Sequence, residues 1–173
     1  MKKLKFLALG LVAAFGFAAC GDDEETVFGE KAQLGGSNCA TIGSFWTYDN
    51  GAQTKEQLGE TGANVIFAFS TTDPDNFKFI SGTDAKNTIV NSTASVTKFL
   101  EIKNLTPEGF DELSFDNAAT QISIDKKLAK GRRAVAFFNE KCQGFFEILS
   151  FDEESEIAEI RVWKKDDAKI RLE

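Results

Sequence analysis

The chain has 173 residues, with 27 acidic and 20 basic side chains, a net charge of −7 and no histidine. The absence of histidine removes the commonest general base, the usual partner of a nucleophilic serine or cysteine, and the imidazole ligands of most metal sites. The net negative charge argues against nucleic acid as a partner. We therefore expect a protein that is not an enzyme and that uses no metal or cofactor.

Residues 1–19 have the pattern of an export signal. Three lysines lie among the first five residues, an apolar run covers residues 6–17, and Ala18 and Ala19 precede Cys20. The run is too short to span a bilayer, which needs ~20 apolar residues. The pattern resembles a bacterial lipoprotein signal peptide, which implies that the Cys20 thiol carries fatty-acyl chains such as palmitate and that the mature chain begins at Cys20. The alternative is an ordinary secretory signal cut near Ala19, with Cys20 as a spare thiol.

Four carboxylates follow the cysteine: Asp22, Asp23, Glu24 and Glu25. They resemble the acidic surface-export signal of Bacteroidota lipoproteins, which implies a lipid anchor in the outer membrane and a domain that faces the cell exterior. The alternatives are a solvated acidic tether and a domain that faces the periplasm. Because residues 20–37 have few large apolar side chains, we expect them to form a lipidated, flexible tether, followed by a single domain over residues 38–173.

With Cys20 acylated, Cys39 and Cys142 remain as an even pair in an oxidising compartment. This count predicts a disulfide between Cys39 and Cys142 that stabilises the fold. The alternative is a pair of buried thiols.

The first half of the domain predicts strands with one helix between them. A strand is expected over residues 44–48, and residues 65–69 read as a central strand with both faces covered. Thr54 and Gln57 have the spacing of a capping box, which begins a short helix that ends near Gly59 or Gly62. Residues 77–80 are expected to form a partner strand of the central one.

The middle of the domain is more mixed. Residues 81–95 are rich in small polar side chains and read as a long loop, and residues 99–103 read as a strand. Thr106 and Pro107 begin a helix that includes Phe110 and Leu113. Residues 114–128 are compatible with a helix or with a strand at residues 122–124.

Three apolar runs with short polar turns between them make up the last third, over residues 134–138, 145–151 and 157–163. They predict an antiparallel C-terminal β-meander in which Ala158, Ile160 and Val162 share one face. Residues 168–172 could add a short strand. The fold class expected is therefore α+β, mainly antiparallel sheet with a C-terminal β-meander and two or three short helices.

The domain resembles a recurrent type found in Bacteroidota surface lipoproteins of unassigned function. The resemblance is carried by Asn38, Ile42, Gly43, Ser44 and Phe45 at the start of the domain, by the central aromatic strand, and by the motifs Thr97-Lys98-Phe99, Leu105-Thr106 and Phe110-Asp111. It implies the fold and the cellular location and assigns no chemistry.

Candidate ligand contacts are few. Trp46, Tyr48 and Trp163 could stack on sugar rings, and a basic cluster could meet an acidic glycan, a lipid phosphate or a protein; its members are Lys126, Lys127, Lys130, Arg132 and Arg133. The alternative for the cluster is a solvated connection between strands. Two further possibilities are weaker: paired carboxylates among Asp111, Glu112, Asp116 and residues 152–156, and calcium at residues 73–76, which have the composition of a plain turn.

These patterns lead to two functional hypotheses. The first is a non-enzymatic, lipid-anchored surface module for binding, adhesion or assembly with an envelope protein. The alternative is a glycan-binding lipoprotein of a polysaccharide uptake system, which requires an exposed Trp46 or Trp163.

Overall fold

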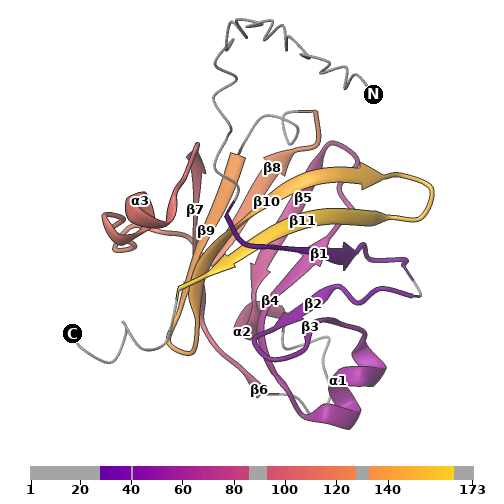
Figure 1. The fold of residues 1–173 in the computed structure, drawn as a ribbon. Coiled ribbons are helices and arrows are strands. Elements are labelled where there is room, and N and C mark those ends of the chain that lie inside the picture. Colours follow the sequence, from indigo (N-terminus) through magenta and orange to yellow (C-terminus); the bar gives the residue numbers. More distant parts are fainter. Residues whose placement is uncertain (1–27, 40, 86–92, 128–132, 166–173) are drawn as a thin grey trace, which may run out of the picture.

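The computed structural model describes residues 28–39, 41–85, 93–127 and 133–165, which form two sheets packed face to face (Figure 1). The first sheet has the strand order β1 (Glu30–Gly35), β11 (Ile157–Lys164), β10 (Gln143–Asp152), β9 (Arg133–Asn139), β7 (Thr97–Lys103). The second has the order β3 (Gly51–Gln53), β2 (Phe45–Thr47), β4 (Asn64–Ser70), β5 (Asn76–Ser81), β8 (Gln121–Asp125), and β6 (Thr93–Ala94) runs parallel to β4. All other pairs are antiparallel.

The structure therefore confirms a chain of mainly antiparallel sheet with a few short helices. Strands β9, β10 and β11 follow one another along the chain, and each pairs antiparallel with the next. In β11 the alternation expected from the sequence is present, because Ala158, Ile160 and Val162 are buried. Residues 122–124, left between helix and strand by their sequence, lie in β8.

The described residues include three short helices. Helix α1 (Lys55–Thr61) has the predicted capping box, in which Thr54 Oγ1 accepts from the Gln57 amide and Gln57 Oε1 accepts from the Thr54 amide, and it ends at Gly62 in the left-handed conformation. Helix α3 (Pro107–Asp111) begins at Thr106 as predicted, but it ends before Leu113. None of these helices is long or apolar enough to cross a membrane.

Two sequence interpretations are corrected here. Glu30–Gly35, placed in the flexible tether, is strand β1, and it pairs along its length with β11. Its low apolar content misled because an edge strand needs only one buried face, and Leu34 supplies most of that face. Residues 81–95, read as a loop, contain helix α2 (Gly82–Ala85) and β6.

Several predictions concern segments outside the described residues. These are the signal peptide and Cys20, the acidic run from Asp22 to Glu25, two members of the basic cluster, Lys130 and Arg132, and the terminal strand at residues 168–172.

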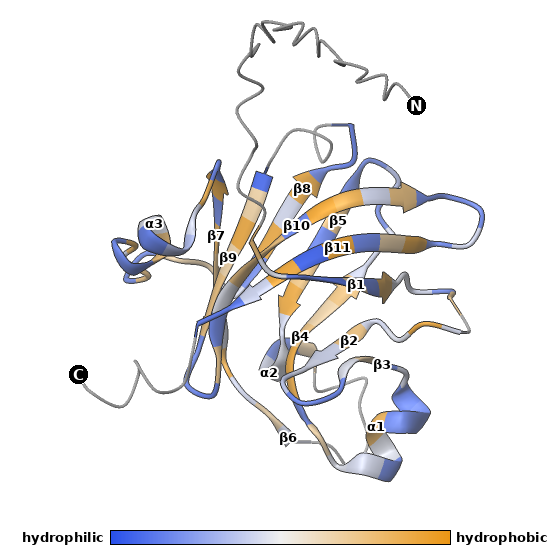
Figure 2. Cartoon of the chain, viewed as in Figure 1, coloured by the Kyte–Doolittle hydropathy of each residue, from blue (hydrophilic) through white to orange (hydrophobic). Residues whose placement is uncertain are grey.

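Aromatic side chains fill the space between the two sheets. Phe67 of β4 is at the centre, with Phe79, Phe99, Phe137 and Phe146 as neighbours at ring-centroid distances of 5.3 to 6.1 Å. Figure 2 shows hydrophobic residues along the strands and hydrophilic ones in the turns and on α1. Burial of these rings is the main source of stability, at ~25 cal/mol per Å² of apolar surface.

The outer face of the first sheet carries a second apolar cluster. Phe110 of α3 packs there on Phe145 and Trp163, and Phe115 packs on Phe138. The segment after β7 thus folds back over its own sheet, which Figure 1 shows as α3 lying to the side of β7 and β9.

Thr97 and Asn139 form a buried polar network between the sheets. The Asn139 side-chain amide donates to Thr97 Oγ1 at 2.8 Å, and Thr97 Oγ1 donates to the Ile66 carbonyl of the second sheet. The Thr97 amide donates to Ser81 Oγ at 2.9 Å. Thr97, Asn139 and Ser81 are each at most 1% exposed. Because water cannot reach these polar groups, each depends on its protein partner for a hydrogen bond.

Candidate functional site

Trp46 is not an exposed stacking platform. Its side chain points from β2 into the interior and is 4% exposed. The indole lies parallel to the Phe67 ring, with the planes 6° apart and the centroids 6.0 Å apart. The expectation that Trp46 offers a face to a sugar ring is therefore wrong.

Tyr48 and Trp163 keep more exposure, but each already uses a ring face. The Lys164 ammonium lies 4.9 Å above the Tyr48 ring and donates to the Tyr48 carbonyl at 2.9 Å, which links the two sheets. Trp163 is half-buried, stacks on Phe145 with centroids 5.2 Å apart and meets Phe110 edge-on.

A pocket of about 450 Å³ opens between the edge strands β1 and β3, and we name it the β1–β3 pocket. It is lined by both tryptophans together with residues of β1, β3 and the end of β11: Gly29, Glu30, Lys31, Ala32, Trp46, Gly51, Val162, Trp163 and Lys164. Two of the three predicted aromatic residues, Trp46 and Trp163, thus line one pocket, although their ring faces are mostly occupied by protein.

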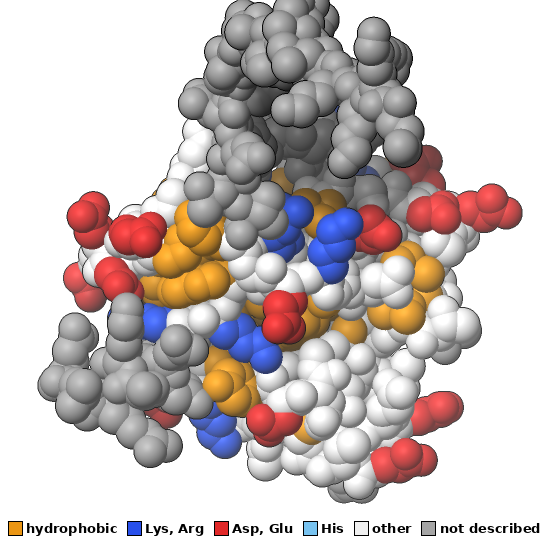
Figure 3. All heavy atoms as spheres, in the orientation of Figure 1, with side chains coloured by type: hydrophobic (Ala, Val, Ile, Leu, Met, Phe, Trp, Pro, Cys, Tyr) orange, Lys and Arg blue, Asp and Glu red, His pale blue; other side chains and the backbone are white. Residues whose placement is uncertain are grey.

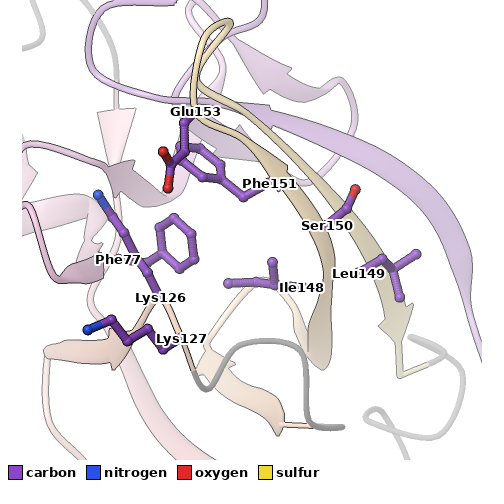
Figure 4. A pocket seen from close by; sticks show the side chains of 8 residues that line it. All are labelled: Phe77, Lys126, Lys127, Ile148, Leu149, Ser150, Phe151 and Glu153. Carbon is purple, nitrogen blue, oxygen red and sulfur yellow. The ribbon is translucent and has the colours of Figure 1, made fainter.

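A second pocket, of about 380 Å³, lies where β8 and β10 diverge, and we name it the β8–β10 pocket (Figure 4). Its lining residues are Phe77, Lys126, Lys127, Ile148, Leu149, Ser150, Phe151 and Glu153. Its size falls within the ~300–1,000 Å³ that is usual for small-molecule sites.

A β-bulge marks the part of β10 that lines this pocket. Among the described residues β9 pairs with β10 over residues 143–147, and the register of β10 against β11 shifts between Ile148 and Ser150. Such a bulge bends a strand and increases its twist. The bulge therefore lies within the part of β10 that lines the pocket, residues 148–151.

Lys126 is the central charged group of this pocket. Its ammonium lies 5.6 Å from the Phe77 ring centroid and 5.8 Å from that of Phe151, so it faces both rings. It also donates to the Thr71 carbonyl at 3.5 Å. In Figure 4 the ammonium of Lys127 and the carboxylate of Glu153 lie on the same side of the cavity as that of Lys126.

The structure divides the predicted basic cluster. Lys126 and Lys127 line the pocket, whereas Arg133 forms an ion pair with Glu101 on the neighbouring strand β7. The cluster therefore does not act as one continuous basic surface over the residues described.

Glu156, in the turn between β10 and β11, ties that turn to the other sheet. Its carboxylate accepts from the Asn38 side-chain amide at 2.9 Å, from the Asn38 backbone amide at 3.0 Å and from Thr71 Oγ1 at 2.9 Å. These bonds favour the ionised form and hold the pKa of Glu156 below its usual value of 4.5. We call this group of contacts the Glu156 clamp.

Cys39 and Cys142 are both thiols, so the predicted disulfide is wrong. Cys39 lies at the Glu156 end of the sandwich, next to Gly35, whereas Cys142 precedes β10 at the opposite end. Ten residues of β10 separate the two ends, on the order of 30 Å at ~3.3 Å per residue, and a disulfide needs Cα atoms within ~7 Å. Burial raises the pKa of the Cys39 thiol, but hydrogen bonds with the backbone of Ile42 and Thr41 hold that pKa below its usual value.

In the acidic turn at residues 73–76, the carboxylate of Asp73 bonds to the backbone of its own turn and to a nearby lysine. Asp73 Oδ1 accepts from the backbone amides of Asp75 and Asn76 at 3.0 Å each, and the Lys78 ammonium lies 3.2 Å from Asp73 Oδ2. These contacts lower the pKa of Asp73 to about 2. The geometry is that of an Asx turn, and no cluster of three potential metal ligands occurs within the described ranges.

No protein-family model, curated protein or solved structure matches this chain. The site is therefore defined by its own geometry: two pockets at the two ends of a sandwich whose interior is packed with aromatic rings.

The sequence located Lys126 and Lys127 but not their apolar partners. Phe77 and Phe151 lie on different sheets, 74 residues apart in the sequence, and they meet with ring centroids 4.9 Å apart. No local pattern predicts such a meeting. The signal in the sequence was the basic cluster in an acidic chain, of which these two lysines are members.

Proposed function

We propose that this chain is a lipid-anchored, non-enzymatic binding module of the cell envelope and that the β8–β10 pocket is its ligand site. The observation that carries the proposal is the position of Lys126 and Lys127 at the rim of a largely apolar pocket in a chain whose net charge is −7. Acidic side chains on the face in Figure 3 stand mainly at the periphery, over α3, the β10–β11 turn and α1. A pocketed positive charge in such a protein attracts anions locally.

The anchor is proposed from the sequence. Cys20 with its preceding apolar run supports acylation, and the four carboxylates from Asp22 to Glu25 support export to the outer surface. Strand β1 begins at Glu30, so only a short connection would lie between a lipid at Cys20 and the folded domain. A module held this close to the membrane would meet ligands at the surface of the cell.

Metabolic labelling with a radioactive or alkyne-bearing palmitate tests the anchor. We expect the wild-type chain to incorporate the label and to fractionate with the outer membrane. Cys20→Ala should abolish incorporation, and Cys39→Ala serves as a matched control that keeps it. Incorporation that survives Cys20→Ala would contradict the proposal.

A glycan-binding module is the second candidate, and the observation that favours it is the β1–β3 pocket. Trp163 lines this pocket, is half-buried, and lies beside the polar side chains of Glu30 and Lys164. A sugar bound there would contact the Trp163 indole rather than the covered ring of Trp46.

Tryptophan fluorescence separates this candidate from the first. If the β1–β3 pocket binds glycans, neutral oligosaccharides will change the emission of the wild-type chain and of Trp46→Phe, and Trp163→Phe will lose the response. If the β8–β10 pocket is the ligand site, none of the three proteins will respond to neutral sugars.

A further inference from the structure

The β8–β10 pocket has two chemically different sides. The two lysine ammoniums lie along one side, and the remaining lining is largely apolar, with Phe77, Ile148, Leu149 and Phe151. We propose that this pocket binds an amphipathic anion, whose carboxylate or phosphate head lies beside Lys126 and Lys127 and whose apolar part rests on Phe151 and its neighbours. This inference rests on the proposed function and names the ligand class of the same site.

Lys126 is positioned to receive the head group. An ammonium has three donors, and the only hydrogen bond of this one to protein is the 3.5 Å contact with the Thr71 carbonyl, as far as the described residues show. Phe77 and Phe151 hold the ammonium near their rings and limit its freedom. A charged donor that is already restrained loses less entropy when it binds an anion.

Lys127 supplies the second positive charge from the chain segment that leaves β8. Its backbone amide donates to Asp125 Oδ1 at 2.8 Å, which fixes the direction of the turn, while its side chain is exposed. Two ammoniums along the same side of the pocket suit a head group with two or more oxygens.

The apolar part of the pocket is continuous with the core. Phe77 and Ile148 are 1% and 8% exposed, so they form a floor, and the half-buried ring of Phe151 supplies an accessible wall, whereas the Leu149 side chain points away from these rings (Figure 4). A short alkyl chain or a single ring would cover this surface. Inorganic anions would gain nothing from it, and a neutral alcohol would gain nothing from the lysines.

Glu153 carries a negative charge near the proposed position of the anionic head group. Its neutralisation should therefore change the affinity in the opposite direction from neutralisation of a lysine. Its carboxylate is exposed and lies on the lysine side of the pocket (Figure 4). A bound anion is repelled by this carboxylate, so neutralising Glu153 should tighten binding, whereas neutralising either lysine should weaken it.

Isothermal titration calorimetry of the whole chain carrying Cys20→Ala tests the inference without detergent. Decanoate is the probe. Decanol has the same alkyl chain with a neutral head group, and acetate has the same carboxylate without the long alkyl chain. We expect binding of decanoate at least tenfold tighter than that of decanol or acetate. Lys126→Gln should weaken decanoate binding about tenfold and Lys127→Gln about threefold, Glu153→Gln should tighten it about threefold, and Lys141→Gln, an exposed lysine in the β9–β10 turn, should leave it unchanged.

Vesicles of phosphatidylglycerol form a second arm, because the same chemistry could come from a free amphiphile or from a lipid head group. Binding of decanoate alone assigns the site to free amphiphiles, and Lys127-dependent binding to the vesicles assigns it to lipid. The inference would be overturned if decanol bound as tightly as decanoate, or if neither decanoate nor the vesicles bound. It would also be overturned if Glu153→Gln and Lys127→Gln had the same affinity for decanoate. Palmitate labelling at Cys20 does not depend on the pocket, so its result distinguishes failure of the inference from failure of the anchor.

Discussion

The two sheets are joined by polar groups in two very different settings. Thr97, Asn139 and Ser81 form a buried network at one end of the sandwich, each at most 1% exposed. The Glu156 clamp joins the sheets at the other end, where Asn38 is exposed and Glu156 is half-buried. Both use hydrogen bonds of similar length, so the difference between them shows how far burial decides what a polar contact contributes to stability.

The two ends also differ in what they leave open. The β8–β10 pocket lies at the clamp end, with Lys126 bonded to the carbonyl of Thr71, whose hydroxyl donates to Glu156. The opposite end holds the buried network and the β1–β3 pocket, where the Lys164 ammonium already lies over the Tyr48 ring and donates to the Tyr48 carbonyl. A weaker, solvated cross-link thus lies beside the proposed ligand site.

Asn139→Ala is expected to have the largest effect on this comparison. The substitution removes the donor to Thr97 Oγ1 and to the Val96 carbonyl and leaves a small cavity. The free energy of unfolding should fall by about 3 kcal/mol. Urea denaturation followed by circular dichroism measures it, and a loss below about 1 kcal/mol would show that the network is not as dry as its burial indicates.

Thr97→Val should be somewhat less costly. Valine keeps the shape of threonine but leaves the Ile66 carbonyl and the Asn139 amide without their partner, for a loss of about 2 kcal/mol. Combined with Asn139→Ala in a double-mutant cycle, the losses should fall short of their sum by at least about 0.5 kcal/mol, because both variants break the same bond. Additive losses would mean that the two side chains act independently.

Glu156→Gln should cost less than about 1 kcal/mol at neutral pH. The single amide oxygen can still accept from the Asn38 backbone amide and from Thr71 Oγ1, while the bond from the Asn38 side-chain amide is lost, and the charged bonds that are replaced are solvated. Glu154→Gln, an exposed residue of the same turn, is a control for the general loss of an acidic residue. A loss as large as that of Asn139→Ala would remove the distinction between the two ends.

The pH dependence of stability gives the smallest effect and has a definite sign. Because the pKa of Glu156 is lower in the folded chain than its usual 4.5, its contribution is present above pH 4.5 and is lost as the pH falls through the folded value. Asp73 behaves in the same way between its usual 3.8 and about 2. The midpoint temperature of thermal unfolding should fall less steeply between pH 6 and pH 2 in Glu156→Gln than in the wild type. Parallel curves of midpoint temperature against pH would contradict the lowered pKa of Glu156.

Local patterns predicted most of the strands and helices and few of the contacts that define the site. The capping box at Thr54 and Gln57 located α1, and alternation in residues 157–163 gave the buried face of β11. Strand β1 was missed because its pairing with β11 is more than 120 residues away in sequence and its own composition is polar. The number of cysteines predicted a pair between Cys39 and Cys142, but that number gives no information on how far apart the two residues lie in the fold.

The site shows the same limit. Lys126 and Lys127 stand out in the sequence because they belong to a basic cluster in an acidic chain. Phe77 and Phe151 look like ordinary core residues, and only the fold shows that they line a pocket. Trp46 stands out for the opposite reason, because a tryptophan suggests a ligand contact, yet it packs on Phe67 in the core.

Lysine labelling of intact cells with a membrane-impermeant amine reagent, read by mass spectrometry, tests the anchored binding module most directly. The account predicts that Lys127 and Lys55 of helix α1, both exposed, are modified on intact cells, and that decanoate protects Lys127 while Lys55 stays reactive. If neither lysine is modified until the outer membrane is broken, the domain does not face the exterior. If decanoate protects both equally or neither, the β8–β10 pocket is not the ligand site.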